Sequence, residues 1–119
     1  MQEAHHNLGS ILIETGRAQE SISHIENAIR IAHDDSINYR TLGKAYLLLD
    51  RPQEALVHIR KSIELGNKSA DVYLVLGAVL HELGEYQEAI EPLSHALILQ
   101  PKNKEANIYM GEALFELRA

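Results

Sequence analysis

The sequence of 119 residues contains no cysteine and no tryptophan, and aromatic residues make up only 5% of it. The absence of cysteine excludes disulfides and thiolate metal sites. With so few aromatic residues, the hydrophobic core must consist mainly of leucine, isoleucine, valine and alanine. No apolar run approaches the roughly 20 residues of a membrane-spanning helix, and no basic segment followed by an apolar one opens the chain. We therefore expect no membrane partner and a cytoplasmic location.

Long runs of one charge are also missing. The formal net charge is −6 at pH 7, spread over the whole sequence. Nucleic-acid binding needs clustered lysine and arginine that neutralise phosphates. We therefore expect no nucleic-acid partner, and the acidic balance is typical of a solvated helical surface.

Glycine recurs at a fixed interval and reveals an internal repeat. Six of the seven glycines fall in two columns of one register: Gly9, Gly43, Gly77 and Gly111 at intervals of 34 residues, and Gly16 and Gly84 at 68. Other columns keep the same register, among them Leu8, Leu42, Leu76 and Met110, then Ile25, Ile59 and Leu93, then Ser21, Ala55 and Ala89. The chain is therefore a tandem array of one 34-residue unit.

Each unit has the apolar spacing of two amphipathic helices. Leu42, Ala45 and Tyr46 follow the i, i+3, i+4 pattern of one helix face, and the second half of the unit repeats the pattern after a short break. Pro52 suits the first position of a helix, where no backbone N–H is needed. The pattern predicts seven helices, at residues 2–15, 18–32, 36–49, 52–66, 70–83, 86–99 and 104–117.

A glycine in the middle of a helix costs roughly 1 kcal/mol relative to alanine, so its recurrence in the first helix of four successive repeats needs a structural reason. Without a Cβ atom, the neighbouring helix can pack nearly onto the backbone. The second helices offer a matching surface of small residues: Ser21, Ala55, Ala89, Ala28, Ser62 and Ala96. We therefore interpret these glycines as sites of close helix packing and not as phosphate-binding loops.

The pattern resembles the tetratricopeptide repeat family, whose consensus is an aromatic residue-x2-Leu-Gly-x2-Tyr, then Ala-x3-Phe, then Pro. The second unit carries it in Tyr39, Leu42, Gly43, Tyr46, Ala55 and Ile59, and the third in Tyr73, Leu76, Gly77, Leu80, Ala89, Leu93, Ala96 and Pro101. The first unit departs from the consensus at His5, Ser21 and His33, and the last helix departs from it at Asn107.

The resemblance implies an all-α fold, a right-handed α-solenoid of antiparallel helix pairs with seven helices. It implies a single domain over residues 1–119, with repeats 2–35, 36–69 and 70–103 and a half-repeat helix at 104–119. It also implies that the first helices of the repeats line a concave groove that binds ligands.

The function implied by the resemblance is a scaffold or adaptor that holds a peptide or protein segment in this groove, without a cofactor. The groove residues that we single out are Arg40, Lys44, Leu47, Leu48, Asp71, Leu74, Val75, Ala78, His81, Ile108 and Tyr109. An exposed apolar strip of this kind indicates an interaction site. Packing between neighbouring repeats would explain each of its apolar residues as well.

Arg40 and Lys44 lie four residues apart and therefore on one helix face. One interpretation is an anchor for a carboxylate or phosphate on the ligand, which arginine can bind through two hydrogen bonds. The alternative is that both pair with acidic side chains of neighbouring repeats, because surface ion pairs are common and weak.

Tetratricopeptide domains that hold the acidic tails of heat-shock chaperones use a dicarboxylate clamp. The clamp needs Lys and Asn in the first repeat, Asn in the second, and Lys and Arg in the third. This chain has other residues there, namely His6, Ser10, Thr41, Asp71 and Val75. We therefore predict that the partner is not a chaperone tail.

Seven histidines raise the question of a metal site or of catalysis. His24 and His58 occupy equivalent positions on neighbouring second helices, but no third ligand lies one helical turn away. No nucleophile–histidine–acid motif and no phosphate-binding motif is present. We expect neither an enzyme nor a metal site.

The last predicted helix is apolar at Ile108, Tyr109, Phe115 and Leu117, although repeat arrays normally end in a polar capping helix. Two alternatives to the adaptor function follow. The chain self-associates through uncapped ends, or it is a fragment of a longer array whose ends are covered by further repeats.

Overall fold

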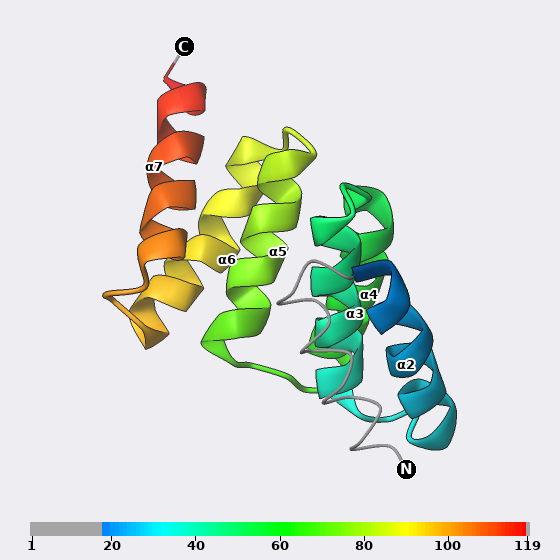
Figure 1. The fold of residues 1–119 in the computed structure, drawn as a ribbon. Coiled ribbons are helices and arrows are strands. Elements are labelled where there is room, and N and C mark those ends of the chain that lie inside the picture. Colours follow the sequence, from blue (N-terminus) through cyan, green and yellow to red (C-terminus); the bar gives the residue numbers. More distant parts are fainter. Residues whose placement is uncertain (1–17, 119) are drawn as a thin grey trace. The chain divides into compact units, whose positions relative to one another are not determined.

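The computed structural model describes residues 18–118, and all regular structure in that range is helical (Figure 1). Its helices are α2 (Ala18–Ile31), α3 (Ser36–Leu48), α4 (Pro52–Glu64), α5 (Ala70–Glu82), α6 (Tyr86–Leu99) and α7 (Lys104–Leu117). They confirm six of the seven predicted helices to within two residues at each end. The predicted helix 2–15, with His5, His6, Gly9 and Ser10, lies outside the described residues, as does Gly16. None of the six described helices is long and apolar enough to cross a membrane.

The chain divides into two compact units, residues 1–67 and 68–119. In the first unit, α3 packs against both α2 and α4; in the second, α5 packs against α6, and α7 contacts both. Successive helices within each unit are joined by short turns (Figure 1). The division falls between the second and third repeats of the sequence.

The described first helices of the repeats begin with the same kind of N-cap. The side chains of Asp35, Ser69 and Asn103 accept hydrogen bonds from backbone N–H groups two or three residues further on, at 2.9, 3.2 and 3.0 Å. Loss of such a cap costs about 1 kcal/mol. The caps lie 34 residues apart, so the polar connector of each repeat fixes where its next helix starts.

The turn between the two helices of a repeat contains a residue in the left-handed conformation. Asp50 has a φ of 58° and Gly84 a φ of 78°, and the two lie 34 residues apart. Glycine adopts this conformation without steric cost, and aspartate is one of the few L-residues that tolerate it. Gly84 of the second glycine column therefore reflects the geometry of the turn and not close helix packing.

Each second helix is buried through a row of three residues, which we call the small–aliphatic–small row: a small residue, an aliphatic one four positions later and a small one three positions after that. All nine such residues have an exposed fraction of 0%: Ser21, Ile25 and Ala28 on α2, Ala55, Ile59 and Ser62 on α4, and Ala89, Leu93 and Ala96 on α6. The buried hydroxyls are satisfied, since Ser62 Oγ donates to the carbonyl of Ser36 at 2.7 Å and Ser21 Oγ to that of Ala18 at 2.7 Å.

Gly43 and Gly77 of the first glycine column meet these rows, as the sequence predicts, whereas Gly111 does not and Gly9 lies outside the described residues. A Cβ atom on Gly43 would lie 3.4 Å from Ile59, and one on Gly77 would lie 2.5 Å from Cγ and Cδ2 of Leu93. The second contact is closer than real Cβ atoms approach, so a Cβ atom at position 77 would force the Leu93 side chain or the α6 helix to shift. At Gly111 nothing lies within 4 Å of the same point.

Candidate functional site

The α3 part of the predicted groove combines two cations with an exposed leucine. Arg40 and Lys44 are half-buried one helical turn apart, Leu47 is half-buried, and Leu48 has an exposed fraction of 59%. Both cations also take part in interactions within the chain. A ligand that binds here would therefore share or replace existing partners.

The α5 part of the predicted groove is largely interior. Leu74, Val75 and Ala78 have exposed fractions of 7%, 4% and 3%, whereas Asp71 and His81 are half-buried. The burial of these three apolar residues agrees with the alternative interpretation of the apolar strip, in which its side chains serve packing and not ligand binding. They do not form an exposed apolar surface.

His81 joins α5 to the following two helices. Its ring centroid lies 5.3 Å from that of Tyr86 on α6 and 5.3 Å from that of Tyr109 on α7, both in edge-on contact. Such ring pairs prefer edge-to-face geometry. Burial raises the pKa of Tyr109, and three nearby carboxylates raise it further: Glu82, Glu105 and Glu112. Two predicted groove residues, His81 and Tyr109, are thus in contact within an acidic environment.

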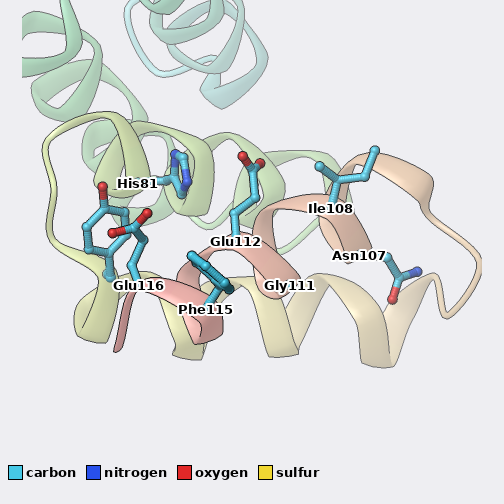
Figure 2. A pocket seen from close by; sticks show the side chains of 8 residues that line it. His81, Asn107, Ile108, Gly111, Glu112, Phe115 and Glu116 are labelled. Atoms are coloured by element: carbon cyan, nitrogen blue, oxygen red, sulfur yellow. The ribbon is translucent and has the colours of Figure 1, made fainter. Parts of the chain in front are cut away.

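A pocket of about 420 Å³ opens beside His81, where the end of α5 and the start of α6 meet one face of α7 (Figure 2). The residues that line it are His81, Tyr86, Asn107, Ile108, Gly111, Glu112, Phe115 and Glu116. Figure 2 shows the carboxylates of Glu112 and Glu116 on the same side of α7 as His81. The sequence singles out His81 and Ile108 as groove residues but misses Tyr86, Asn107 and Gly111 as pocket residues. The signal for Gly111 was its place in a column of helix-packing glycines.

His58, considered above as a metal ligand, is engaged in ring stacking. Its ring stacks on those of Tyr39 and Tyr46, at centroid distances of 6.5 and 5.3 Å. A similar stack joins Tyr73 and His95 at 4.0 Å. Within residues 18–118, no three His, Asp or Glu side chains are grouped to hold a metal ion. His58 on α4 therefore packs against α3 through its ring.

The stability of the protein is expected to fall in mild acid because of His58. Burial lowers the pKa of His58 below 6.5, and this effect outweighs the opposing carboxylates of Glu26 and Glu54. The unfolded chain then binds the proton more readily than the folded one. The contribution of His58 to the free energy of unfolding is therefore complete at neutral pH. It is lost as the pH falls through 6.5 towards the lower pKa of His58 in the folded state. Urea unfolding of wild type and His58→Phe between pH 5 and 7.5 should show a shallower pH dependence in the variant; identical slopes would contradict the assignment.

Family models described as tetratricopeptide repeats match residues 1–68 and 70–103. Because the first match alone covers more than half of the sequence, the chain belongs to the tetratricopeptide repeat family. No curated protein matches it as an individual relative.

Solved structures with the same fold include the TPR domain of Arabidopsis OM64, which is 25% identical, covers 94% of this chain and 93% of that one, and has a TM-score of 0.87. The first TPR of Spaghetti (RPAP3), bound to the HSP90 peptide SRMEEVD, is 19% identical with coverages of 99% and 96% and a TM-score of 0.92. The second TPR domain of human RPAP3, in complex with the HSP70 peptide SGPTIEEVD, is 21% identical with coverages of 95% and 95% and a TM-score of 0.84. The last two proteins hold chaperone peptides, so the predicted exclusion of chaperone tails gains no support from these structures.

Proposed function

We propose that this chain is a non-enzymatic scaffold that holds a peptide or protein segment in a concave groove. The groove is formed by the first helices of repeats that stack in a right-handed array within one domain, residues 1–119. The observation that carries the proposal is the tetratricopeptide match over residues 1–68 and 70–103. Stacked repeats create extended concave binding surfaces, and two structures of the same fold contain bound peptides.

Within the groove, Arg40 and Lys44 are proposed to recognise a carboxylate of the ligand, and Leu47 and Leu48 to contact an apolar side chain beside it. Arginine binds carboxylates through two parallel hydrogen bonds. On the other unit, Ile108 and Tyr109 are proposed to continue the apolar contact, with Asp71 and His81 as polar neighbours. Leu74, Val75 and Ala78 are proposed to support the groove from the interior, since they are nearly fully buried.

The test is a selection of peptides from a random library on the intact chain, followed by titration of the selected peptides against variants. We expect them to combine apolar residues with an acidic one, and to bind Arg40→Glu at least tenfold more weakly, since a hydrogen bond to a charged group contributes about 1.5–3 kcal/mol. Arg60→Glu is the matched control, because Arg60 is exposed on α4. Circular dichroism should show the same helical content in all three proteins. If no peptide is selected, or if Arg40→Glu binds equally well, the groove assignment fails.

The peptide SRMEEVD belongs in the same titration. Thr41, Asp71 and Val75 occupy positions where a chaperone clamp needs Asn, Lys and Arg, and Asp71 would repel a carboxylate at close range. We therefore expect binding at least tenfold weaker than that of the selected peptides. Equal affinity would reverse the exclusion of chaperone tails while leaving the scaffold function in place.

A further inference from the structure

Four residues follow one side of α3 and form what we call the α3 stripe: Ile37, Arg40, Lys44 and Leu48. Residues three or four positions apart lie on the same face of a helix. Ile37 and Leu48, at the two ends of the stripe, have exposed fractions of 43% and 59%, and the two cations between them are half-buried. The other side of α3 is packed, since Leu42 and Ala45 have exposed fractions of 2% and 0%. The stripe is therefore the accessible side of α3.

Packing of the repeat does not require aliphatic residues at the two ends of the stripe. All other units have a carboxylate at the position of Ile37 and another at that of Leu48: Glu3 and Glu14, Asp71 and Glu82, and Glu105 and Glu116. Among the described ones, Asp71 is half-buried and the other three are exposed. Contacts within the repeat therefore do not account for the aliphatic side chains of α3, and paired exposed aliphatic residues indicate an interaction surface.

The middle of the stripe also differs from the other units. At the positions of Arg40 and Lys44, the other units have no lysine or arginine: His6 and Ser10, Leu74 and Ala78, and Ile108 and Glu112. A carboxylate gains charge-assisted hydrogen bonds from such cations, and a basic ligand is repelled by them. A ligand carboxylate would share the two cations with their present partners in the chain. The stripe is thus complementary to an acidic residue flanked by aliphatic ones.

The length of the stripe and its cationic middle favour an extended ligand over a helical one. Leu48 follows Ile37 by 11 residues, which is about 16 Å along a helix that rises 1.5 Å per residue. An extended chain covers that length with about five residues, at roughly 3.3 Å each. An amphipathic helix needs a continuous apolar groove for the side chains of its successive turns. Arg40 and Lys44 interrupt the apolar surface of the stripe at its centre.

We propose that the α3 stripe binds an extended segment of a partner protein in which one acidic residue lies between two aliphatic residues. The carboxylate contacts Arg40 and Lys44. One aliphatic residue packs on Leu48 and the other on Ile37, about four to six positions apart in an extended chain. The inference rests on the proposed function, because it specifies what the groove recognises. It adds Ile37 to the groove as a residue that determines specificity.

Synthetic peptides with blocked ends in a glycine–serine background separate the order of residues from composition. Two bracketed peptides carry one glutamate midway between two leucines, which are four residues apart in one peptide and six in the other. A reordered peptide has both leucines on one side of the glutamate, and a lysine peptide has lysine in place of the glutamate.

We expect the intact chain to bind at least one bracketed peptide five times more tightly than the reordered peptide, since the reordered one loses the burial of one leucine. The lysine peptide should bind at least tenfold more weakly than the bracketed one at low salt. Calorimetry in about 0.5 M salt should reduce the second difference, because exposed charges are screened there, and should retain the first. If the reordered peptide binds as tightly as both bracketed ones, or if no peptide binds at millimolar concentration, the proposal fails.

Ile37→Gln tests the new contact on the protein. The other units have polar side chains at this position, so helical content and melting temperature should be retained, while affinity for the bracketed peptide falls at least fivefold. Val57→Gln is the matched control, because Val57 is 66% exposed on α4 and lies outside the stripe. If Arg40→Glu weakens binding and Ile37→Gln does not, the groove function stands and the present inference is overturned. If neither variant weakens binding, both are overturned.

Discussion

The Ile59→Ala variant is expected to lose about 2–5 kcal/mol of unfolding free energy. Ile59 is fully buried at the centre of the α4 row, and its backbone N and Cβ lie within 3.4 Å of the point where a Cβ on Gly43 would stand. The α3 and α4 helices cannot close the resulting cavity freely, because Ser62 Oγ is hydrogen-bonded to the carbonyl of Ser36. Urea denaturation followed by circular dichroism would measure the loss.

The control is Val57→Ala, two residues earlier on the same helix. Val57 is 66% exposed, so its truncation should change the unfolding free energy by no more than about 0.5 kcal/mol. Equal losses in the two variants would mean that α4 does not bury the face described above.

The Gly77→Ala and Gly111→Ala variants are expected to change stability in opposite directions, although each adds one methyl group to the same column. At position 77 the methyl group would lie 2.5 Å from Leu93, and overpacking of this kind costs about 1–3 kcal/mol. The better helix propensity of alanine offsets at most about 1 kcal/mol of that. At position 111 nothing opposes the methyl group, so the gain of up to about 1 kcal/mol remains.

Gly43→Ala should fall between the two, because its Cβ would lie at the edge of ordinary contact, 3.4 Å from the backbone of α4. Melting curves of the three variants give the order directly. A destabilised Gly111→Ala variant would show that another part of the chain covers α7, and a stabilised Gly77→Ala variant would show that α5 and α6 lie further apart than described.

The position of the helices could be predicted from the sequence because each boundary depends on local chemistry. Asp35, Ser69 and Asn103 are good N-caps at one point of the period, and Asp50 and Gly84 tolerate the left-handed turn. The close packing of Gly43 and Gly77 was also predictable, since an unfavourable residue that recurs at one position has to serve packing or turn geometry; the same argument fails at Gly111, where nothing lies within 4 Å of an added Cβ.

The surface of the candidate site was less predictable, because periodicity defines the faces of a helix but not what lies opposite each face. Leu74 and Val75 fall on the face expected to line the groove, yet both are buried. Asn38 is also fully buried, and among the described residues neither polar atom of its side chain has a hydrogen-bond partner. Asn38 occupies the same position of the repeat as Val72 and Ala106, which are buried as well. This position, and not the polarity of the side chain, accounts for its burial. The pocket beside His81 forms where the start of α6 meets α7. This contact between helices cannot be predicted from a local sequence pattern.

The fully buried rows of the second helices limit which substitutions the repeat can accept. An added methyl group at any of these nine positions would push a neighbouring helix outward, so we expect them to accept only residues of similar volume. The exposed residues of the first helices are under no such restriction from packing. Divergence can therefore change what the repeat recognises while the spacing of its helices stays constant.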